Sequence, residues 1–132
     1  MASAFVGSWK PVESVNLDAF MKELGIGKDT RILAGFLKTT AVISIKGDEF
    51  TIEVTSILRN YTTTFVLGVE FDDTTIDGRS VRSKYTLENG HIIQVEKTGD
   101  KIATFDRFIE DGKMITICKC GDVEARRVDE KC

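Results

Sequence analysis

Apolar and polar positions alternate along most of this chain, and the alternation predicts a mostly β protein. Eight runs carry apolar or β-branched residues at every second position and read as strands. These runs are residues 40–46, 50–56, 57–67, 79–87, 91–97, 101–109, 113–119 and 123–131. Glycine next to aspartate or asparagine separates most of them and supplies the positive φ angles of tight hairpins. Strands about 10–12 residues apart and joined by hairpins indicate an antiparallel up-and-down sheet.

Residues 16–38 break this alternation and predict two short helices. In the first helix, four apolar residues at i, i+3, i+4 and i+7 form one face: Leu17, Phe20, Met21 and Leu24. Asn16 is expected to cap its start. In the second helix, Asp29 is the expected cap. The apolar residues that this second helix would present are Ile32, Leu33, Phe36 and Leu37.

The number of strands predicts a closed barrel. With a first strand before the helices, the pattern gives about ten strands, and an open sheet would expose two edges. A barrel of this strand number is wider than side chains alone can fill. Two strand faces mix apolar with small polar residues, as a cavity lining would: Val81, Ser83, Tyr85 and Leu87, and Met114, Thr116, Cys118 and Cys120. We therefore expect a ten-stranded antiparallel up-and-down β-barrel with an internal cavity and a two-helix lid at about 16–38.

Length and composition indicate one globular domain over residues 1–132. Eighteen basic and 21 acidic side chains give a net charge of −3, which argues against nucleic acid as a partner. No apolar run approaches the roughly 20 residues that span a bilayer. Three cysteines form no disulfide framework, and the start lacks the features of a secretory signal. The expected location is the cytoplasm.

The closing strand, "VEARRVDEK", carries charge on both of its faces. One face holds Val123, Ala125, Arg127 and Asp129, and the other holds Glu124, Arg126, Val128 and Glu130. One of these faces must look into the barrel. A protein that places an arginine and an aspartate inside needs a polar partner for them, which an ordered water or a ligand with a polar end would supply.

Three segments carry a resemblance to a known family. "FVGSWKPVESVNLDAFMKELGIG" near the start, "LGVEFDDTTIDGRSVRS" in the middle and the closing arginine strand resemble the fatty-acid-binding proteins of the intracellular lipid-binding family. The match is collinear over essentially the whole chain. It implies a monomeric intracellular carrier, a β-clam with a helical lid, that holds one long-chain fatty acid in a water-lined cavity. It implies no enzymatic activity, no cofactor and no metal.

The resemblance also implies the ligand site. The family grips the ligand carboxylate with two arginines and a tyrosine, and these positions fall here on Arg107, Arg127 and Asp129. Arg127 and Asp129 would point inward together, while Arg126 and Val128 face out. The other expected ligand-binding residues are Phe105, Thr116 and Cys118. The expected portal, at the helical segment, is lined by Met21, Ile26, Leu33, Leu58, Asp77 and Arg79.

Asp129 is the departure from the family pattern that bears most directly on the ligand. A tyrosine offers the carboxylate a hydroxyl donor, whereas an ionised aspartate offers none. Asp129 could pair with Arg127 and leave Arg107 as the main anchor, or it could accept a hydrogen bond from a ligand hydroxyl and favour hydroxylated or neutral lipids. We favour the first, because two inward guanidiniums without a counter-charge are costly. Pro11 is a second departure and predicts an edge or a bulge in the first strand.

Other functions remain open at this point. The ligand could be a retinoid or another lipid class, and contact of the helical lid with membranes could be transient. A lipid-modifying enzyme on the same barrel is disfavoured, because the single histidine, His91, has no nucleophile partner pattern. Cys118 and Cys120 are too few for a zinc site. A secreted lipocalin shares the "GSW" element but is longer and has a leader, and a membrane-stacking protein would be revealed by vesicle clustering.

Overall fold

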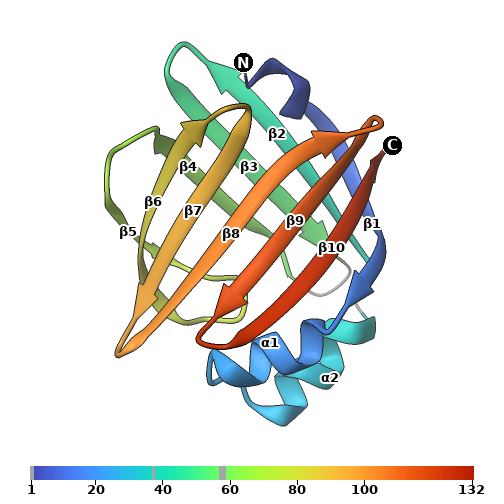
Figure 1. The fold of residues 1–132 in the computed structure, drawn as a ribbon, viewed down its shortest axis with the longest axis vertical. Coiled ribbons are helices and arrows are strands. Elements are labelled where there is room, and N and C mark those ends of the chain that lie inside the picture. The colour runs from blue at the N-terminus through green and yellow to red at the C-terminus, as the bar shows by residue number, and fades with distance from the viewer. Residues whose placement is uncertain (1, 37, 57–58) are drawn as a thin grey trace.

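The computed structural model describes residues 2–36, 38–56 and 59–132 and confirms the predicted fold class. Ten antiparallel strands form one curled sheet, and two helices lie across one of its ends (Figure 1). The strands are β1 Gly7–Val15, β2 Thr39–Lys46, β3 Glu49–Ser56, β4 Tyr61–Val66, β5 Phe71–Thr74, β6 Ser80–Glu88, β7 His91–Thr98, β8 Lys101–Glu110, β9 Lys113–Cys120 and β10 Val123–Lys131. The helices are a 3-10 turn η1 Ser3–Phe5, α1 Leu17–Glu23 and α2 Lys28–Phe36.

The strand order is that of an up-and-down barrel, because every pair of consecutive strands except β4 and β5 is paired and β1 also pairs with β10. Pro11 marks a register shift in β1, where the pairing with β10 slips between Pro11 and Glu13. This confirms the expected bulge, since proline has no N–H to give to the ladder. Of the predicted run 57–67, residues 57 and 58 lie outside the described residues and the strand β4 covers Tyr61–Val66. The four-residue β5 has no counterpart among the predicted runs.

Backbone pairing does not close the barrel completely. Within the described part of the chain, β4 and β5 are the two edges of the sheet and share no ladder. Side chains link them instead. The Tyr61 hydroxyl donates a hydrogen bond to Asp73, and the rings of Phe65 and Phe71 stack with 6.2 Å between centroids. The sheet therefore closes at its two edge strands, β4 and β5, through side-chain contacts and not through backbone hydrogen bonds.

The first helix packs as its apolar pattern predicts. Phe20 and Leu24 are buried, and they form a cluster with small residues of the barrel wall, including Ala103 and Ala125. The prediction that the Asn16 side chain caps the first helix is wrong. Asn16 has a left-handed backbone (φ 63°), its side chain accepts no hydrogen bond from the helix, and its amide donates to the Glu124 carbonyl at 2.8 Å. The asparagine therefore ties the start of the lid to β10.

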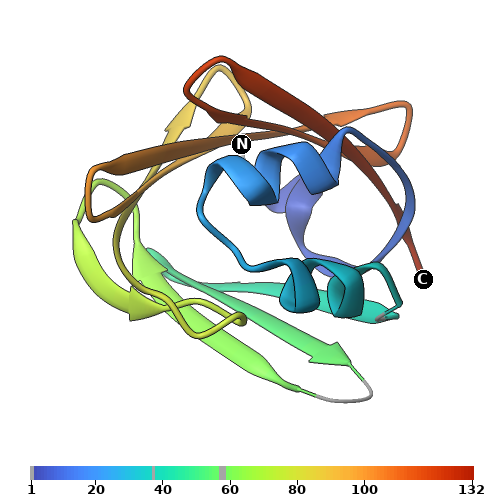
Figure 2. The same cartoon turned by 90° about the horizontal axis from the view of Figure 1, so that it is seen from below.

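The second helix lies beside the first over the end of the barrel, as the view from below shows (Figure 2). It begins at Lys28, so Asp29 lies in its first turn and does not cap it. Arg31 fixes it to the first helix by an ion pair with Asp18 (3.0 Å) and a hydrogen bond to the Ile26 carbonyl (2.6 Å). Ile32 and Leu33 are 52% and 46% exposed, so the expected apolar covering face is wrong for these residues. Leu37 lies outside the described residues.

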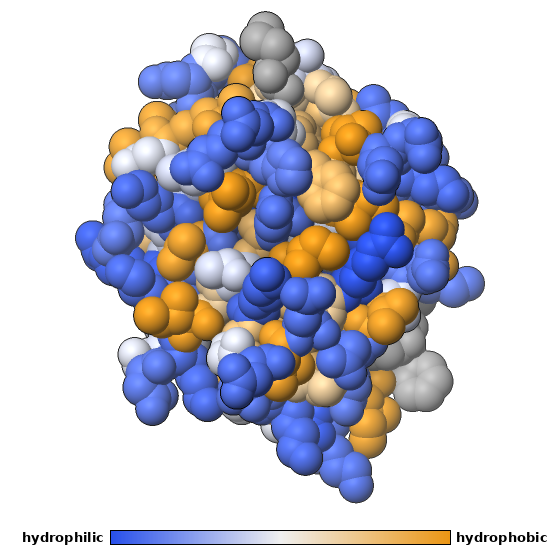
Figure 3. All heavy atoms as spheres, viewed as in Figure 1, coloured by the Kyte–Doolittle hydropathy of each residue, from blue (hydrophilic) through white to orange (hydrophobic). Residues whose placement is uncertain are grey.

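A second core fills the barrel toward the end away from the helices. Its buried members are Phe5, Trp9, Ile43, Phe50, Phe65, Tyr85, Ile92 and Met114. The Trp9 indole N–H donates to the Phe5 carbonyl at 2.9 Å, which satisfies the only polar atom of this large buried side chain. On the outside, hydrophilic residues cover much of the face seen in Figure 3, with apolar residues in small groups between them.

Candidate ligand-binding site

The register of three neighbouring strands places both predicted arginines in one row. Arg107 of β8 and Arg127 of β10 pair with the same residue of β9, Thr116. Two strand spacings separate the backbones of the two arginines, which is roughly 10 Å. Thr116 and Asp129 are buried and Arg126 is exposed, but Val128, which was expected to face out with Arg126, is also buried, and the Arg127 side chain is 38% exposed. The interior position of the row therefore rests on Arg107, whose guanidinium contacts the buried Tyr85 and Gln94.

Three residues contact the Arg107 guanidinium, and one of its buried nitrogens has no hydrogen-bond partner among the described residues. Its Nη2 donates to Gln94 Oε1 at 3.0 Å. The guanidinium carbon lies 5.4 Å from the ring centroid of Phe105 and 5.8 Å from that of Tyr85, within cation–π range. Nη1 is buried and has no hydrogen-bond partner among the described residues. A buried N–H without a partner is costly, so this atom favours binding of an acceptor.

Asp129 contacts Arg127 without a hydrogen bond. Its Oδ1 lies 3.8 Å from Arg127 Nη2, which is an ion pair but too long for a hydrogen bond. The same oxygen is buried and has no hydrogen-bond partner in the described structure. Burial raises the pKa of Asp129, although Arg127 and Arg107 oppose the rise. The favoured pairing with Arg127 is thus present, but it leaves the carboxylate incompletely satisfied.

Phe105 and Cys118 connect this site to the lid. The ring of Phe105 meets that of Phe20 edge-on, with 5.6 Å between centroids. Cys118 is buried in the cluster below α1, and burial raises its pKa, so its thiol is neutral near pH 7. The predicted ligand-binding residues therefore lie together on the inner wall formed by β8, β9 and β10. Their contact with a ligand stays a prediction.

Comparison with known proteins decides the family. A family model described as the lipocalin / cytosolic fatty-acid binding protein family matches residues 6–131. This chain belongs to that family. Human "Fatty acid-binding protein 9" is 43% identical over 131 residues, which cover 99% of each chain. The adipocyte fatty acid-binding protein of Pygoscelis papua is 41% identical with the same coverage.

Solved structures of the family agree with the fold. A Schistosoma mansoni fatty acid binding protein in complex with arachidonic acid has a TM-score of 0.94 and 32% identity, with 99% of this chain and 98% of that chain covered. The fatty acid-binding protein from Drosophila melanogaster brain has a TM-score of 0.86 and 40% identity, with 96% and 98% covered. The resemblance read from the three sequence segments is confirmed.

The predicted portal residues of this family member are not all alike in the structure. Met21 and Ile26 pack against the cluster below the lid, whereas Leu33 is largely exposed. Leu58 lies outside the described residues. Asp77 and Arg79 form an ion pair of 2.6 Å in the turn between β5 and β6, at the lid end of the barrel (Figure 1).

This ion pair belongs to a partly buried charge cluster, of which Glu96 is the fully buried member. Arg79 also contacts Glu96 of β7 at 3.2 Å, and the Thr75 hydroxyl donates to Asp77 at 2.7 Å. Burial alone would raise the pKa of Asp77, but the hydrogen bonds from Arg79 and Thr75 hold it below its usual value. Burial raises the pKa of Glu96 despite the opposing charge of Arg79. The cluster ties the turn to the barrel wall beside the lid.

Two functional candidates were missed by the sequence analysis. Gln94 positions Arg107, and Glu96 binds Arg79, and both are buried. The signal was the alternation of β7, which places them on one face with the buried Ile92. Inward polar residues on β7 therefore indicate the functional site as well as the arginine and aspartate of the closing strand do.

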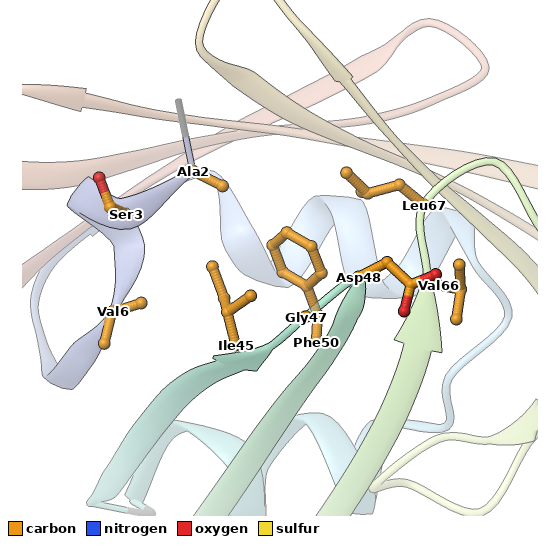
Figure 4. Close-up of a pocket in the computed structure, with 9 residues that line it drawn as sticks. All are labelled: Ala2, Ser3, Val6, Ile45, Gly47, Asp48, Phe50, Val66 and Leu67. Atoms are coloured by element: carbon orange, nitrogen blue, oxygen red, sulfur yellow. The ribbon is translucent and has the colours of Figure 1, made fainter.

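One hollow lies at the end of the barrel away from the lid (Figure 4). It has a volume of about 620 Å³ and is lined by Ala2, Ser3, Val6, Ile45, Gly47, Asp48, Phe50, Val66 and Leu67. Phe50 also begins a stack of rings that continues through Phe65 to Tyr85, with centroids 5.4 and 3.6 Å apart. Because Tyr85 in turn contacts Arg107, these rings stand between the hollow and the predicted head-group site.

None of the described helices is long and apolar enough to cross a membrane. Within the described ranges, no group of three or more histidine, cysteine, aspartate or glutamate side chains is arranged to hold a metal ion.

Proposed function

We propose that this protein is a carrier that binds one long-chain fatty acid, or a similar hydrophobic ligand, inside its barrel and moves it through the cytosol. The observation that carries the proposal is the buried Nη1 of Arg107 on the inner wall, which has no hydrogen-bond partner among the described residues. The family and the names of its members support fatty acids as the ligand class. A cytosolic location and a monomeric state are proposed on the same basis.

Hydrophobic burial supplies most of the affinity in this account. Each buried methylene contributes roughly 0.8 kcal/mol, so an acyl chain of ordinary length outweighs any single polar contact. The arginine selects the orientation, because a charge-assisted hydrogen bond is worth about 1.5–3 kcal/mol. The acyl chain would then extend from Arg107 past Phe105 toward Phe20 and the lid, since these residues adjoin one another.

Return of the ligand unchanged is part of the proposal. The buried Cys118 is a neutral thiol, which is a poor nucleophile. His91 Nδ1 lies 2.8 Å from Asp106 Oδ1, outside the row of predicted ligand residues, and its ring stacks on Phe108. Incubation with fatty acids and their esters, followed by mass spectrometry of the lipids, tests the carrier role, and any turnover would contradict it.

Transient membrane contact through the lid is the proposed route of ligand delivery. Ile32 and Leu33 are exposed on α2, and exposed aliphatic side chains on a short helix can enter the membrane interface. Replacing both with serine should slow transfer of a fluorescent fatty acid to anionic vesicles several-fold. Val69, exposed in the β4–β5 connection, gives the control Val69→Ser. An unchanged rate in the double variant would contradict delivery through this helix.

Titration of the delipidated protein with a fluorescent fatty acid tests the carrier function. We expect saturation near one equivalent, and the absence of saturable binding would contradict the proposal. Arg107→Ala should weaken the binding of a fatty acid roughly tenfold to a hundredfold and should weaken the binding of the matching fatty alcohol less. Arg127→Ala should show the same preference to a smaller degree, because Arg127 is already paired with Asp129. Arg126→Ala, which removes an exposed arginine of the same strand, is the matched control.

A further inference from the structure

The head-group site contains a buried donor atom and a buried acceptor atom that have no hydrogen-bond partner among the described residues. Arg107 Nη1 is a buried N–H group without a partner, and Asp129 Oδ1 is a buried carboxylate oxygen without a hydrogen bond, among the residues described. The Asp129 side chain is only 7% exposed, so water reaches it poorly. Buried polar atoms in native proteins are nearly always satisfied, so two in one site point to a ligand that satisfies them.

The two atoms belong to one site. Arg107 and Arg127 lie in one row through Thr116, and Asp129 lies in the next inward row, opposite Met114. Strands β8 and β10 are roughly 10 Å apart. Because the Arg107 side chain is long, the distance from its guanidinium to Asp129 that a head group must span can be shorter than this. The positive charge of Arg107 also partly opposes the rise that burial causes in the pKa of Asp129. One small polar group can therefore meet both.

An ionised carboxylate matches only half of this site. Its oxygens can accept from Arg107 and Arg127, but they have no proton to give to Asp129 and add a second negative charge beside it. A primary amide, by contrast, accepts through its oxygen and donates through its nitrogen. An undissociated carboxyl does the same through its carbonyl and hydroxyl.

We propose that the head-group site selects a long-chain lipid whose polar end both accepts a hydrogen bond from Arg107 and donates one to Asp129, so that a primary fatty amide or an undissociated fatty acid binds more tightly than an ionised fatty acid. This inference rests on the proposed carrier function. It assigns to Asp129 a role in ligand selection that a tyrosine at this position would reverse.

The inference predicts that binding of acids, and not of amides, strengthens as the pH falls. The charged and titratable groups that face Asp129 are Arg127 on its own strand, Arg107 on β8 and Cys118 on β9, while its partner on β1 is Pro11, which carries no charge. Burial raises the pKa of Asp129, which eases its protonation. As the pH falls, the carboxyl of Asp129 or that of the bound fatty acid takes up a proton. The protonated carboxyl can donate a hydrogen bond to the other, so acid binding strengthens. An amide needs no added proton.

Competitive displacement of a pyrene-labelled fatty alcohol from the delipidated protein tests the inference. The competitors are cis-9-octadecenoic acid, its primary amide and its methyl ester, which accepts but cannot donate. At pH 8 we expect the amide to bind about tenfold or more tightly than the ester, as one hydrogen bond to a charged group implies. We expect the acid to bind less tightly than the amide at pH 8 and to gain several-fold at pH 6.

Two variants separate the role of the acceptor from that of titration. Asp129→Leu should abolish the advantage of the amide over the ester. Asp129→Asn keeps a hydrogen-bonding group that does not titrate, so it should remove the pH dependence of acid binding. Glu130→Gln, on the opposite face of β10, is the control and should behave like the natural protein. Affinity for the alcohol probe reports whether each variant is folded.

The results that would overturn the inference are distinct from failure of the carrier function. Equal affinity for amide and ester in the natural protein would overturn it, as would an amide advantage that survives in Asp129→Leu. If acid binding depended on pH equally in the natural protein and in Asp129→Asn, the proton that strengthens acid binding would belong to a group other than Asp129. That result would also overturn the inference. If the probe bound but no competitor displaced it, or if the probe did not bind at all, the carrier function itself would be wrong.

Discussion

At the scale of single residues, the inner wall shows which positions the sequence could and could not predict. A period of two, which a strand fixes by its geometry, put Arg127 and Asp129 on one face, and the family resemblance implied that this face looks inward. The partners of Arg107 did not follow, because Gln94 lies on another strand and its contact depends on register. Tyr85 meets Arg107 across a further strand, for the same reason.

Replacing Asp129 with tyrosine should tighten the binding of simple fatty acids. The change removes a negative charge beside the carboxylate and restores a hydroxyl donor, so a gain of about tenfold at pH 8 is expected. Calorimetric titration of both proteins with the same fatty acid measures it. Unchanged or weaker binding in Asp129→Tyr would show that Asp129 does not restrain carboxylate affinity.

At the scale of secondary-structure elements, the turns and the first helix were predictable from local chemistry. Asn89 and Gly90 both have positive φ angles, as the two-residue hairpin at this position requires. The second helix was harder, because Arg31 joins it to Asp18 of α1 and to the Ile26 carbonyl of the connection between the helices, and its own apolar pattern indicates neither contact. The strand β5 is too short to show a period, and its place depends on pairing with β6.

Truncation of Phe20 should destabilise the lid. Phe20 is buried against Phe105 and the small residues beneath α1, so Phe20→Ala should cost about 3–5 kcal/mol of unfolding free energy. Denaturant unfolding measures the loss. Ile32→Ala on the exposed part of α2 is the control and should change the free energy by less than about 0.5 kcal/mol. A cost for Phe20→Ala no larger than that of the control would mean that the lid does not depend on this contact.

Glu96→Gln should change how stability depends on pH. The pKa of Glu96 is raised above its usual 4.5 by burial, so the folded state binds this proton more tightly than the unfolded state. Stability therefore falls as the pH rises from about 4.5 through the folded-state pKa. Glutamine cannot ionise, so the variant should have the higher melting temperature at pH 7 and no advantage at pH 4. A lower melting temperature at pH 7 would show instead that the ion pair with Arg79 outweighs the cost of burial.

At the scale of the whole molecule, the barrel and its lid could be predicted because strand count and edge avoidance leave few alternatives. How the sheet closes could not be predicted. Strands β4 and β5 adjoin in sequence but are held by Tyr61 with Asp73 and Phe65 with Phe71, and these contacts depend on the curvature of all ten strands. The hollow beside η1 also arises from the packing of three distant segments.

The most direct test of the account is a crystal structure of the protein with a bound long-chain fatty acid. The account predicts one acyl chain inside the barrel, with an oxygen of its head group within hydrogen-bonding distance of Arg107 Nη1 and the chain directed toward Phe20 and the lid. A lipid bound on the outer surface, or in the hollow lined by Ile45, Phe50 and Leu67, would contradict it.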